Sequence, residues 1–267
     1  MAMKNNYALV TGASSGIGLE IARSLAERNY NLVLVARREE QLNAIATEIK
    51  NDFHIDVEVC PADLANPQAP DDIYNFCSAK NLNIEILINN AGYALPHQFH
   101  KTPMQDEEDC LRVLGISVIA LTKVFLPNML EQKSGKIMIV SSVASFAPPS
   151  TIQVLYGPVK TFMNRFSDGI NINYKHKGVT STSVCPGYTV TGFHTASGTQ
   201  KQMDNVPSFM KLDAKVVAEE GLDAMFKGKR LSIPSIRYKV IVFLMTYASS
   251  LLNLFSNQLS GGRYKKN

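Results

Sequence analysis

The sequence predicts an α/β fold with a parallel sheet in one domain, and three observations support it. Short apolar runs alternate with segments of helical length, which is typical of successive strand–helix–strand units. A glycine-rich loop joins the first apolar run to the first helical segment. The chain has 267 residues, 45% of them hydrophobic, which suffices for one substantial core, and no compositional shift marks a linker.

The expected strands all lie within the first 184 residues and are separated by helix-length segments. In parallel units of this kind the crossovers are right-handed, so the carboxyl ends of the strands meet at one edge of the sheet, where open sheets bind their ligands. The expected strands are residues 7–10, 32–36, 57–60, 86–88, 137–140 and 179–184.

The glycine-rich segment 11–18 follows the first expected strand and precedes a helical pattern over residues 19–28. Gly12 permits a tight turn, Gly16 lets the backbone approach a pyrophosphate, and Gly18 lets the helix pack closely against its strand. The helix N-terminus offers free N–H groups to anions. A glycine-rich connection without any ligand is the alternative, because short glycine patterns also occur by chance.

Charge and composition exclude several classes of function. The net charge of +4 comes from 27 basic and 23 acidic residues scattered along the chain, with a small basic cluster at residues 263–266, so we expect no nucleic-acid partner. His97 and His100 lack further ligands nearby, so we expect no metal site. The apolar run at residues 7–10 is too short for a signal peptide, and we expect no export.

The cysteines indicate a reducing compartment. They are far apart and contain no Cys-x-x-Cys pair, which favours packed thiols over disulfides or zinc ligands. We therefore expect a cytoplasmic location. The four cysteines are Cys60, Cys77, Cys110 and Cys185.

Five motifs stand in a fixed order along the chain: residues 11–18, residues 89–92, Ser142, the pair Tyr156 and Lys160, and residues 186–191. Together they resemble the short-chain dehydrogenase/reductase family, NADP-preferring type, and most closely its broad bacterial branch. The resemblance implies a Rossmann-type doubly wound parallel sheet that binds a dinucleotide at its carboxyl edge. It also makes a homo-oligomer the expected state.

The resemblance divides the chain into residues 5–233, an NAD(P)-binding short-chain dehydrogenase domain, and residues 234–260, a C-terminal apolar helix. It implies that Asn90, Ala91 and Gly92 line the adenosine, that Asp63 reaches the adenine, and that residues 187–191 hold the nicotinamide and pyrophosphate. The cofactor contacts assigned by matching are Gly12, Ser14, Ser15, Gly16, Ile17, Gly18, Arg37, Asp63, Asn90, Ala91, Gly92, Tyr156, Lys160, Gly187, Thr189 and Thr191.

The end of the second expected strand indicates which cofactor is used. NAD-dependent enzymes place a carboxylate for the ribose about 20 residues past the glycine loop. Here that position is Ala36, followed by Arg37 and Arg38. Arg37 suits a charge-assisted contact with a 2′-phosphate, so we expect NADP(H). The alternative is a solvated pair of arginines at a helix start.

The resemblance assigns catalysis to Ser142, Tyr156 and Lys160. A free tyrosine, with a pKa of about 10, is a sluggish acid or base at neutral pH. Lys160, one helical turn after Tyr156, is expected to favour the phenolate together with the positive nicotinamide of the cofactor, and Ser142 is expected to orient the substrate oxygen. The expected reaction is hydride transfer between the nicotinamide and a carbonyl or alcohol substrate, with Tyr156 as general acid or base.

Three departures from the family pattern bear on catalysis. The position of a conserved family asparagine, which helps to hold a water near the lysine, is Leu114 here. The interval from Ser142 to Tyr156 is one residue longer than usual, which leaves Ser141 as a second candidate. Pro158 falls two residues after Tyr156 and bends the helix if that helix begins much earlier. These departures sustain an alternative function: an NADPH-binding sensor or sequestering protein with little turnover.

The substrate-binding segment and the C-terminus are less specific. The resemblance makes the region after Gly187 a lid, and Tyr188, Phe193, Phe209 and Met210 are candidate apolar walls for a lipophilic carbonyl or alcohol substrate. Residues 236–255 form an apolar helical tail. This tail packs on its own domain or on a second subunit, or alternatively attaches to a membrane surface with the help of Arg237 and Lys239.

Overall fold

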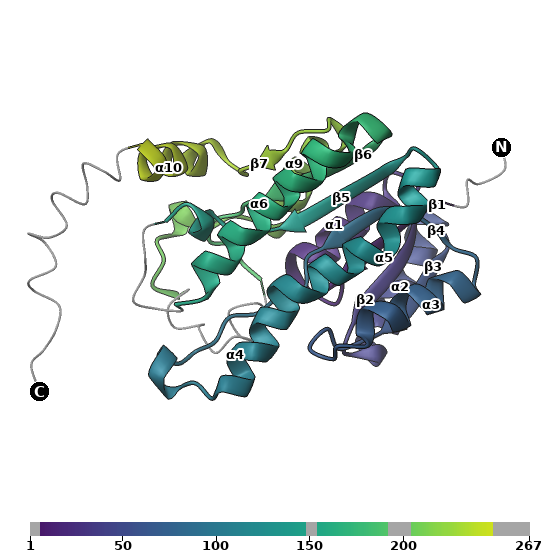
Figure 1. Cartoon of the computed structure of the whole chain (residues 1–267), viewed down its shortest axis with the longest axis horizontal. Coiled ribbons are helices and arrows are strands. Elements are labelled where there is room, and N and C mark those ends of the chain that lie inside the picture. The colour runs from purple at the N-terminus through teal and green to yellow at the C-terminus, as the bar shows by residue number, and fades with distance from the viewer. Residues whose placement is uncertain (1–5, 148–153, 192–203, 248–267) are drawn as a thin grey trace, which may run out of the picture.

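The structure is a computed structural model that describes residues 6–147, 154–191 and 204–247. Seven strands form one parallel sheet in the order β3-β2-β1-β4-β5-β6-β7 (Figure 1). The strand order reverses between β1 and β4, which is where doubly wound sheets open a crevice for a ligand. The strands are β1 (Asn6–Thr11), β2 (Asn31–Ala36), β3 (Val57–Pro61), β4 (Asn83–Asn89), β5 (Gly135–Val140), β6 (Val179–Val184) and β7 (Leu231–Ser232).

All six predicted strands are confirmed, each within an observed strand, and the Rossmann-type fold class is confirmed with them. β7 was not predicted, because two residues are too few to show a period. The described helices are α1 (Gly16–Ala26), α2 (Glu39–Phe53), α3 (Ala69–Ala79), α4 (Met104–Leu111), α5 (Ser117–Glu131), α6 (Tyr156–Tyr174), α9 (Ala214–Phe226) and α10 (Ile236–Tyr247).

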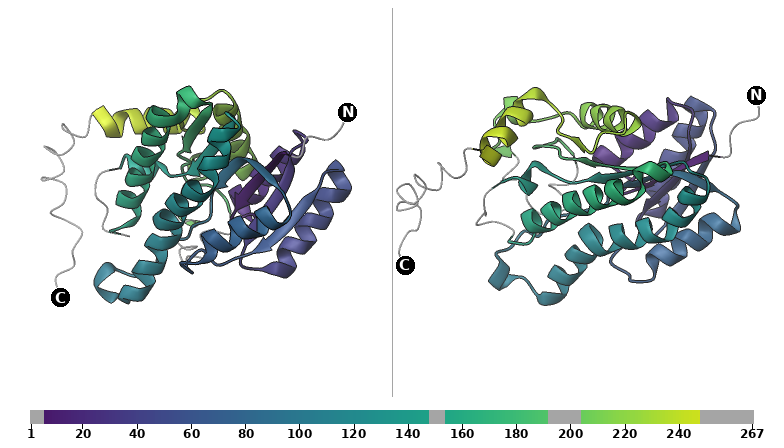
Figure 2. Two further views of the ribbon diagram at one scale, coloured as in Figure 1. Left: turned by 45° about the vertical axis from the view of Figure 1, so that its right-hand side comes forward. Right: turned by 45° about the horizontal axis from the view of Figure 1, so that its top comes forward.

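Helices cover both faces of the sheet (Figures 1 and 2), because its strands are apolar on both sides. In β1, Ala8 and Val10 pack with α1, α2 and α9, whereas Tyr7 and Leu9 pack with α3, α5 and α6. This period-2 division means that a strand buried on both faces shows no alternation in its sequence. It explains why the strands appear in the sequence as continuous apolar runs.

The helical stretch Met104–Glu131 contains α4, a π-helical turn η2 (Arg112–Ile116) and α5. Among the described residues it is long and apolar enough to cross a membrane, with a mean hydropathy of 1.8 over its most apolar window, half of which is buried. Its side chains Leu121, Phe125 and Met129 are buried against the sheet. The stretch is therefore a core helix of this domain.

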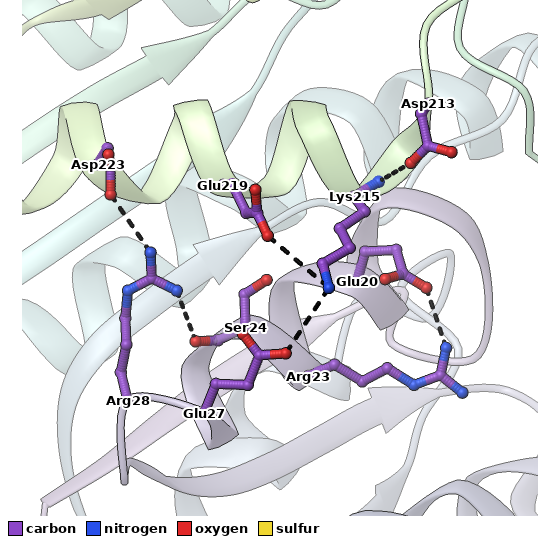
Figure 3. Close-up of polar contacts among 9 residues, drawn as sticks. All are labelled: Glu20, Arg23, Ser24, Glu27, Arg28, Asp213, Lys215, Glu219 and Asp223. Carbon is purple, nitrogen blue, oxygen red and sulfur yellow. Dashed lines mark hydrogen bonds and ion pairs between the residues drawn. The ribbon is translucent and has the colours of Figure 1, made fainter.

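Polar contacts join α1 to α9 at the surface (Figure 3). Arg28 pairs with Asp223 at 3.3 Å, and Lys215 lies 3.9 Å from both Glu27 and Glu219. Such exposed pairs each contribute only about 0–1 kcal/mol. The larger stabilisation comes from the apolar contact beneath them, since both helices bury side chains in the same core cluster. α9 is thus held against the helix that carries the glycine-rich loop.

Thr11 fastens the end of β1 to the end of β4. Its hydroxyl donates to the carbonyl oxygen of Ile88 at 3.1 Å and accepts from the backbone N–H groups of Asn90 at 2.9 Å and Ala91 at 3.1 Å. The side chain is 1% exposed. Three backbone groups just past the sheet therefore depend on one hydroxyl.

We predict that Thr11→Val lowers the free energy of unfolding by about 2–4 kcal/mol, because a buried group left without its partner costs about 1–3 kcal/mol. Thr11→Ser keeps the hydroxyl and is expected to cost only about 1 kcal/mol for the lost methyl. Urea unfolding of the two variants measures the difference. Equal losses would show that the hydroxyl contributes nothing beyond packing.

Candidate active site

One cavity of about 1290 Å³ lies along the carboxyl ends of the strands. Every residue predicted to bind the cofactor or to act in catalysis lines this cavity, except Gly18. Those residues come from the ends of six parallel strands and the segments that follow them. The topology thus gathers into one place residues that are up to 179 positions apart, from Gly12 to Thr191.

The glycine loop can follow its path only with glycine at key positions. Gly12 and Gly16 have φ values of +67° and +58°, in the left-handed region. At Gly18 a Cβ atom would lie 2.3 Å from the carbonyl oxygen of Gly12 and 2.4 Å from the side-chain nitrogen of Asn90. Gly18 therefore lies beneath the loop, where it allows α1 to approach, and this is why it does not face the cavity.

The basic end of the cavity lies after β2. Arg37 and Arg38 are exposed and line the cavity, and the position of the usual ribose-binding carboxylate is Ala36. The Arg38 guanidinium donates to the Ser14 hydroxyl at 3.3 Å, and Gln41 donates to the Ser14 carbonyl oxygen at 2.8 Å. Two arginines beside the glycine loop, with no acid between them, fit a phosphate on the adenosine ribose. Sequence reasoning singled out only Arg37 and missed the contact of its neighbour.

Two predicted contacts for the adenosine also have structural roles. The Asn90 side-chain nitrogen donates to the carbonyl oxygens of Thr11 at 2.9 Å and Gly12 at 3.3 Å. The Asp63 carboxylate accepts from the N–H of Ala65 at 3.0 Å and is itself exposed. Asn90 therefore fixes the glycine loop, while Asp63 faces the cavity from a turn that it stabilises.

The segment after β6 closes the cavity from the other side. The Thr189 hydroxyl donates to the carbonyl oxygen of Gly187 at 3.0 Å, which fixes the turn. A Cβ atom on Gly16 would lie 2.8 Å from Cβ of Thr191, so this segment contacts the glycine loop. Gly16 and Thr191, two predicted cofactor-binding residues on opposite sides of the sheet switch point, are therefore in direct contact.

Ser142, Tyr156 and Lys160 converge at the middle of the cavity. α6 begins at Tyr156, and the Tyr156 hydroxyl is hydrogen-bonded to Ser142. The Lys160 ammonium donates to the carbonyl oxygen of Val140 at 2.8 Å and lies 5.6 Å from the centre of the Tyr156 ring. Ser141 instead donates to the carbonyl oxygen of Lys160 at 3.1 Å. The geometry therefore puts Ser142, rather than Ser141, beside the tyrosine.

Burial controls the protonation of this group. Burial raises the pKa of Tyr156 to about 12, and the hydrogen bond with Ser142 opposes that shift only in part. Burial lowers the pKa of Lys160 to about 8. That Lys160 and a positive nicotinamide together favour the phenolate stays a prediction, because burial is the largest influence on the pKa of Tyr156 in the protein alone. At neutral pH Tyr156 is a phenol, which is the form that donates a proton.

The two other departures from the family pattern have different outcomes. Pro158 lies in the first turn of α6, where its missing N–H has no helical partner to lose, so it is harmless. Leu114 is 2% exposed in the π-helical turn and packs with Cys110 and Val159 beside the Tyr156 ring. An aliphatic side chain thus fills the position of the family asparagine, and it can neither donate nor accept a hydrogen bond.

The substrate side of the cavity is formed by the segment after β6 and by α10. Tyr188 and Met210 line it as predicted, whereas Phe209 is 63% exposed and does not, so that prediction was wrong. Phe209 sits in a short 3₁₀ turn, Ser208–Met210, that directs Met210 inward instead. Phe193 and most of the predicted lid lie outside the described residues.

Sequence reasoning missed the contribution of α10 to the cavity wall. Tyr238 is 2% exposed, and its hydroxyl donates to the carbonyl oxygen of Met210 at 2.7 Å while accepting from the N–H of Tyr188 at 3.0 Å. Its ring lies where a side chain at Gly187 would be, with ring atoms within 2.2 Å of a Cβ placed there. The next turns contribute Ile241 and Met245.

We predict that Lys160→Met changes the pH dependence of stability. The folded pKa of about 8 lies below the ordinary 10.5, so between these values the unfolded chain binds more protons and Lys160 makes stability rise with pH. Across this pH window, the free energy of unfolding of the wild type should rise by up to about 3 kcal/mol relative to that of the variant. Urea unfolding from pH 7 to 11 measures the difference. The control is Lys123→Met, at an exposed lysine of α5. The prediction would be contradicted if the stability difference between the wild type and each variant were independent of pH.

Comparison with known proteins agrees with this geometry. The family described as short chain dehydrogenase matches residues 6–202. A very-long-chain 3-oxoacyl-CoA reductase from Anas platyrhynchos is 35% identical over 191 residues, which is 69% of this chain and 60% of that relative. The corresponding Mus musculus enzyme is 29% identical over 93% of this chain and 81% of its own length.

The fold also matches solved structures. A short-chain dehydrogenase from Sphingobium yanoikuyae in complex with NADPH superposes with a TM-score of 0.81 and 26% identity, covering 98% of both chains. A bulky-bulky ketone specific alcohol dehydrogenase from Comamonas testosteroni, at 24% identity and a TM-score of 0.76, shares the fold over 98% of this chain and 96% of its own. The fold, the order of the motifs and the family match over residues 6–202 agree, and the chain belongs to the short-chain dehydrogenase family of oxidoreductases.

Proposed function

We propose that this protein is an NADPH-dependent reductase of a lipophilic carbonyl compound. The observation that carries the proposal is the convergence of Ser142, a protonated Tyr156 and Lys160 in one cavity whose far end bears Arg37 and Arg38. Single ligand sites commonly enclose about 300–1,000 Å³. The observed 1290 Å³ is enough for a dinucleotide together with a substrate.

In the proposed reaction the bound NADPH supplies a hydride to the carbonyl carbon. The Ser142 hydroxyl donates to the carbonyl oxygen and holds it beside Tyr156. Tyr156 transfers its phenolic proton to that oxygen, which completes the alcohol. Lys160, fixed by Val140, keeps a positive charge near the phenolate that results. The reverse direction, alcohol oxidation, uses the same residues.

The cofactor preference rests on the end of β2. A 2′-phosphate there meets two guanidinium groups and no carboxylate, and a guanidinium suits two parallel hydrogen bonds to such a group. The neighbour from Sphingobium yanoikuyae, which binds NADPH, supports the same choice.

The proposed substrate is a ketone on a long or bulky apolar body. Tyr188, Met210, Ile241 and Met245 form an apolar wall on the substrate side. The relatives from Anas platyrhynchos and Mus musculus are named very-long-chain 3-oxoacyl-CoA reductases, and a 3-oxo group on an acyl chain is a carbonyl of this kind. The family relationship gives no support to the alternative of an NADPH sensor.

Two further expectations remain part of the proposal. A reducing, cytoplasmic setting fits the four cysteines, all of which are buried and free. A homo-oligomer fits the exposed apolar side chains of Ile116, Phe162 and Ile172 near and on α6.

We predict NADPH oxidation by the purified protein with a carbonyl panel that includes aliphatic, aromatic, steroid-like and 3-oxoacyl thioester compounds. Tyr156→Phe should lower kcat by about 10²–10⁴-fold, because it removes the proton donor, with NADPH affinity nearly unchanged. Tyr174→Phe, at the far end of the same helix, is the control and should keep full activity. Tight NADPH binding without turnover of any carbonyl would instead favour the sensor.

We predict that replacing both Arg37 and Arg38 by Ala raises KM for NADPH about 10–100-fold, because charge-assisted contacts of about 1.5–3 kcal/mol are lost. The kcat/KM for NADH should be unchanged, since NADH has no 2′-phosphate. Arg165→Ala, an exposed arginine of α6 outside the cavity, controls for loss of surface charge. An equal change with both cofactors would contradict the assignment.

A further inference from the structure

The described part of α10 is apolar on two opposite faces. One face packs on the domain through Tyr238 and Val242, which are 2% and 5% exposed. The other face consists of large apolar side chains that are 51–72% exposed to solvent. A globular helix ordinarily turns polar residues outward, so this exposed face requires an explanation. We call it the α10 stripe; its members are Ile236, Val240, Phe243, Leu244 and Tyr247.

The α10 stripe has a basic border. With about 100° of rotation per residue, its five members fall within an arc of roughly 100°. Arg237 lies at one edge of this arc and Lys239 at the other, and both are exposed, although Lys239 lies 3.8 Å from the Glu220 carboxylate. An apolar arc between two cations is the arrangement of helices that lie in the interface of an anionic bilayer, with the apolar side chains among the acyl chains.

The distribution of charge along the whole chain points the same way. The 44 residues after Asp223 contain eight basic residues and no acidic one, whereas the preceding 223 contain 19 basic and 23 acidic residues. The net charge of +4 therefore conceals +8 at the C-terminal end and −4 in the remainder. Each basic residue near an anionic leaflet contributes about 1 kcal/mol of attraction. The positive end of the chain is the part that carries the α10 stripe.

The same helix is a wall of the active-site cavity. Ile241 and Met245 line the cavity from the side of α10 that faces the domain, and Tyr238 hydrogen-bonds to the two segments that form the neighbouring walls. Tyr188 and Phe209, in those segments, are also 48% and 63% exposed. The two segments that Tyr238 contacts therefore also carry exposed apolar side chains.

We propose that α10 docks the substrate end of the cavity onto an anionic lipid surface, and that the lipophilic substrate enters from the lipid. Tyr238 and Val242 hold the described part of α10 against the domain, so this part would lie along the lipid surface rather than cross it. A second copy of the chain is a poorer partner, because it would bring a C-terminal end of the same positive charge against this one. Substrate entry rests on the proposed reductase function, whereas docking does not.

The test is co-sedimentation of the full chain with vesicles of phosphatidylcholine containing phosphatidylserine, compared with phosphatidylcholine alone. We expect binding to the anionic vesicles that weakens as salt is raised. The double variant Phe243→Ser, Leu244→Ser should reduce the bound fraction at least about 10-fold, because two large apolar side chains no longer enter the lipid. Arg237→Gln should weaken binding to vesicles that contain phosphatidylserine and should leave binding to pure phosphatidylcholine vesicles unchanged.

The control is Ile172→Ser, which removes a side chain of α6 that is 75% exposed but lies outside the α10 stripe. Phe243 and Leu244 do not line the cavity, so their double variant should reduce a water-soluble carbonyl at the wild-type rate. Equal sedimentation of the wild type and the double variant would overturn the proposal. So would a dimer, measured by light scattering, that the double variant abolishes without any vesicle binding by the wild type.

The experiments distinguish failure of the docking proposal from failure of the reductase proposal. Vesicle binding is measured without cofactor or substrate. A protein that binds anionic vesicles but reduces no carbonyl would support the docking proposal and contradict the reductase proposal. A protein that reduces soluble carbonyls but does not bind vesicles would support the reductase proposal and contradict the docking proposal. Substrate entry from lipid requires faster reduction of a vesicle-borne ketone by the wild type than by the double variant.

Discussion

The close approach of β1 to β4 at the sheet switch point is the constraint on which the rest of the site depends. Thr11 binds backbone groups past the end of β4, and Asn90 returns hydrogen bonds to the glycine loop. Gly18 permits this approach, because any side chain there would overlap the Gly12 carbonyl. The loop, the start of α1 and the β4 end thereby form one rigid unit. The arginines after β2 and the segment after β6 both contact this unit through Ser14 and Gly16.

Burial, more than charge pairing, determines the chemistry at the centre of the cavity. Tyr156 and Lys160 are both removed from water. Burial raises the pKa of Tyr156 and lowers that of Lys160, so it favours the neutral form of both side chains. Leu114 and Val159 contribute to this dry environment, since they pack beside the tyrosine ring. Leu114 also leaves this position without the polar group that the family resemblance predicts there. A protonated tyrosine in an apolar setting suits reduction, in which the protein gives up a proton.

The sequence was sufficient for the sheet and for most of the site, because both follow from local patterns. A strand buried on both faces produces a continuous apolar run, and the glycine, asparagine and Tyr156–Lys160 motifs have fixed spacing. β7, by contrast, is a strand only because Val184 and Ser232 pair across the sheet edge. The contact of Arg38 with Ser14 joins residues 24 positions apart, and that of Tyr238 with Tyr188 joins residues 50 apart. No local pattern specifies such contacts, since they depend on tertiary packing.

Local pattern also misassigned one side chain, Phe209, whose direction the backbone decides. Phe209 and Met210 are adjacent and both apolar, so composition cannot tell which of them faces the cavity. The 3₁₀ turn directs Met210 inward, and Tyr238 holds its carbonyl oxygen there. Likewise the unusual interval after Ser142 left two serines open, and the choice follows from the hydrogen bond of Ser141 to Lys160.

The cavity has opposite chemical character at its two ends, and the order of the strands creates this difference. The basic end follows β2, on one side of the switch point, and the apolar end lies at β6 and α10, on the other (Figure 1). A ligand pair with phosphate at one end and an apolar body at the other can therefore occupy the cavity in only one direction. Its orientation is set before any individual contact at Tyr156 forms. α10, whose outer face is apolar and exposed, is part of the wall at the apolar end of the cavity.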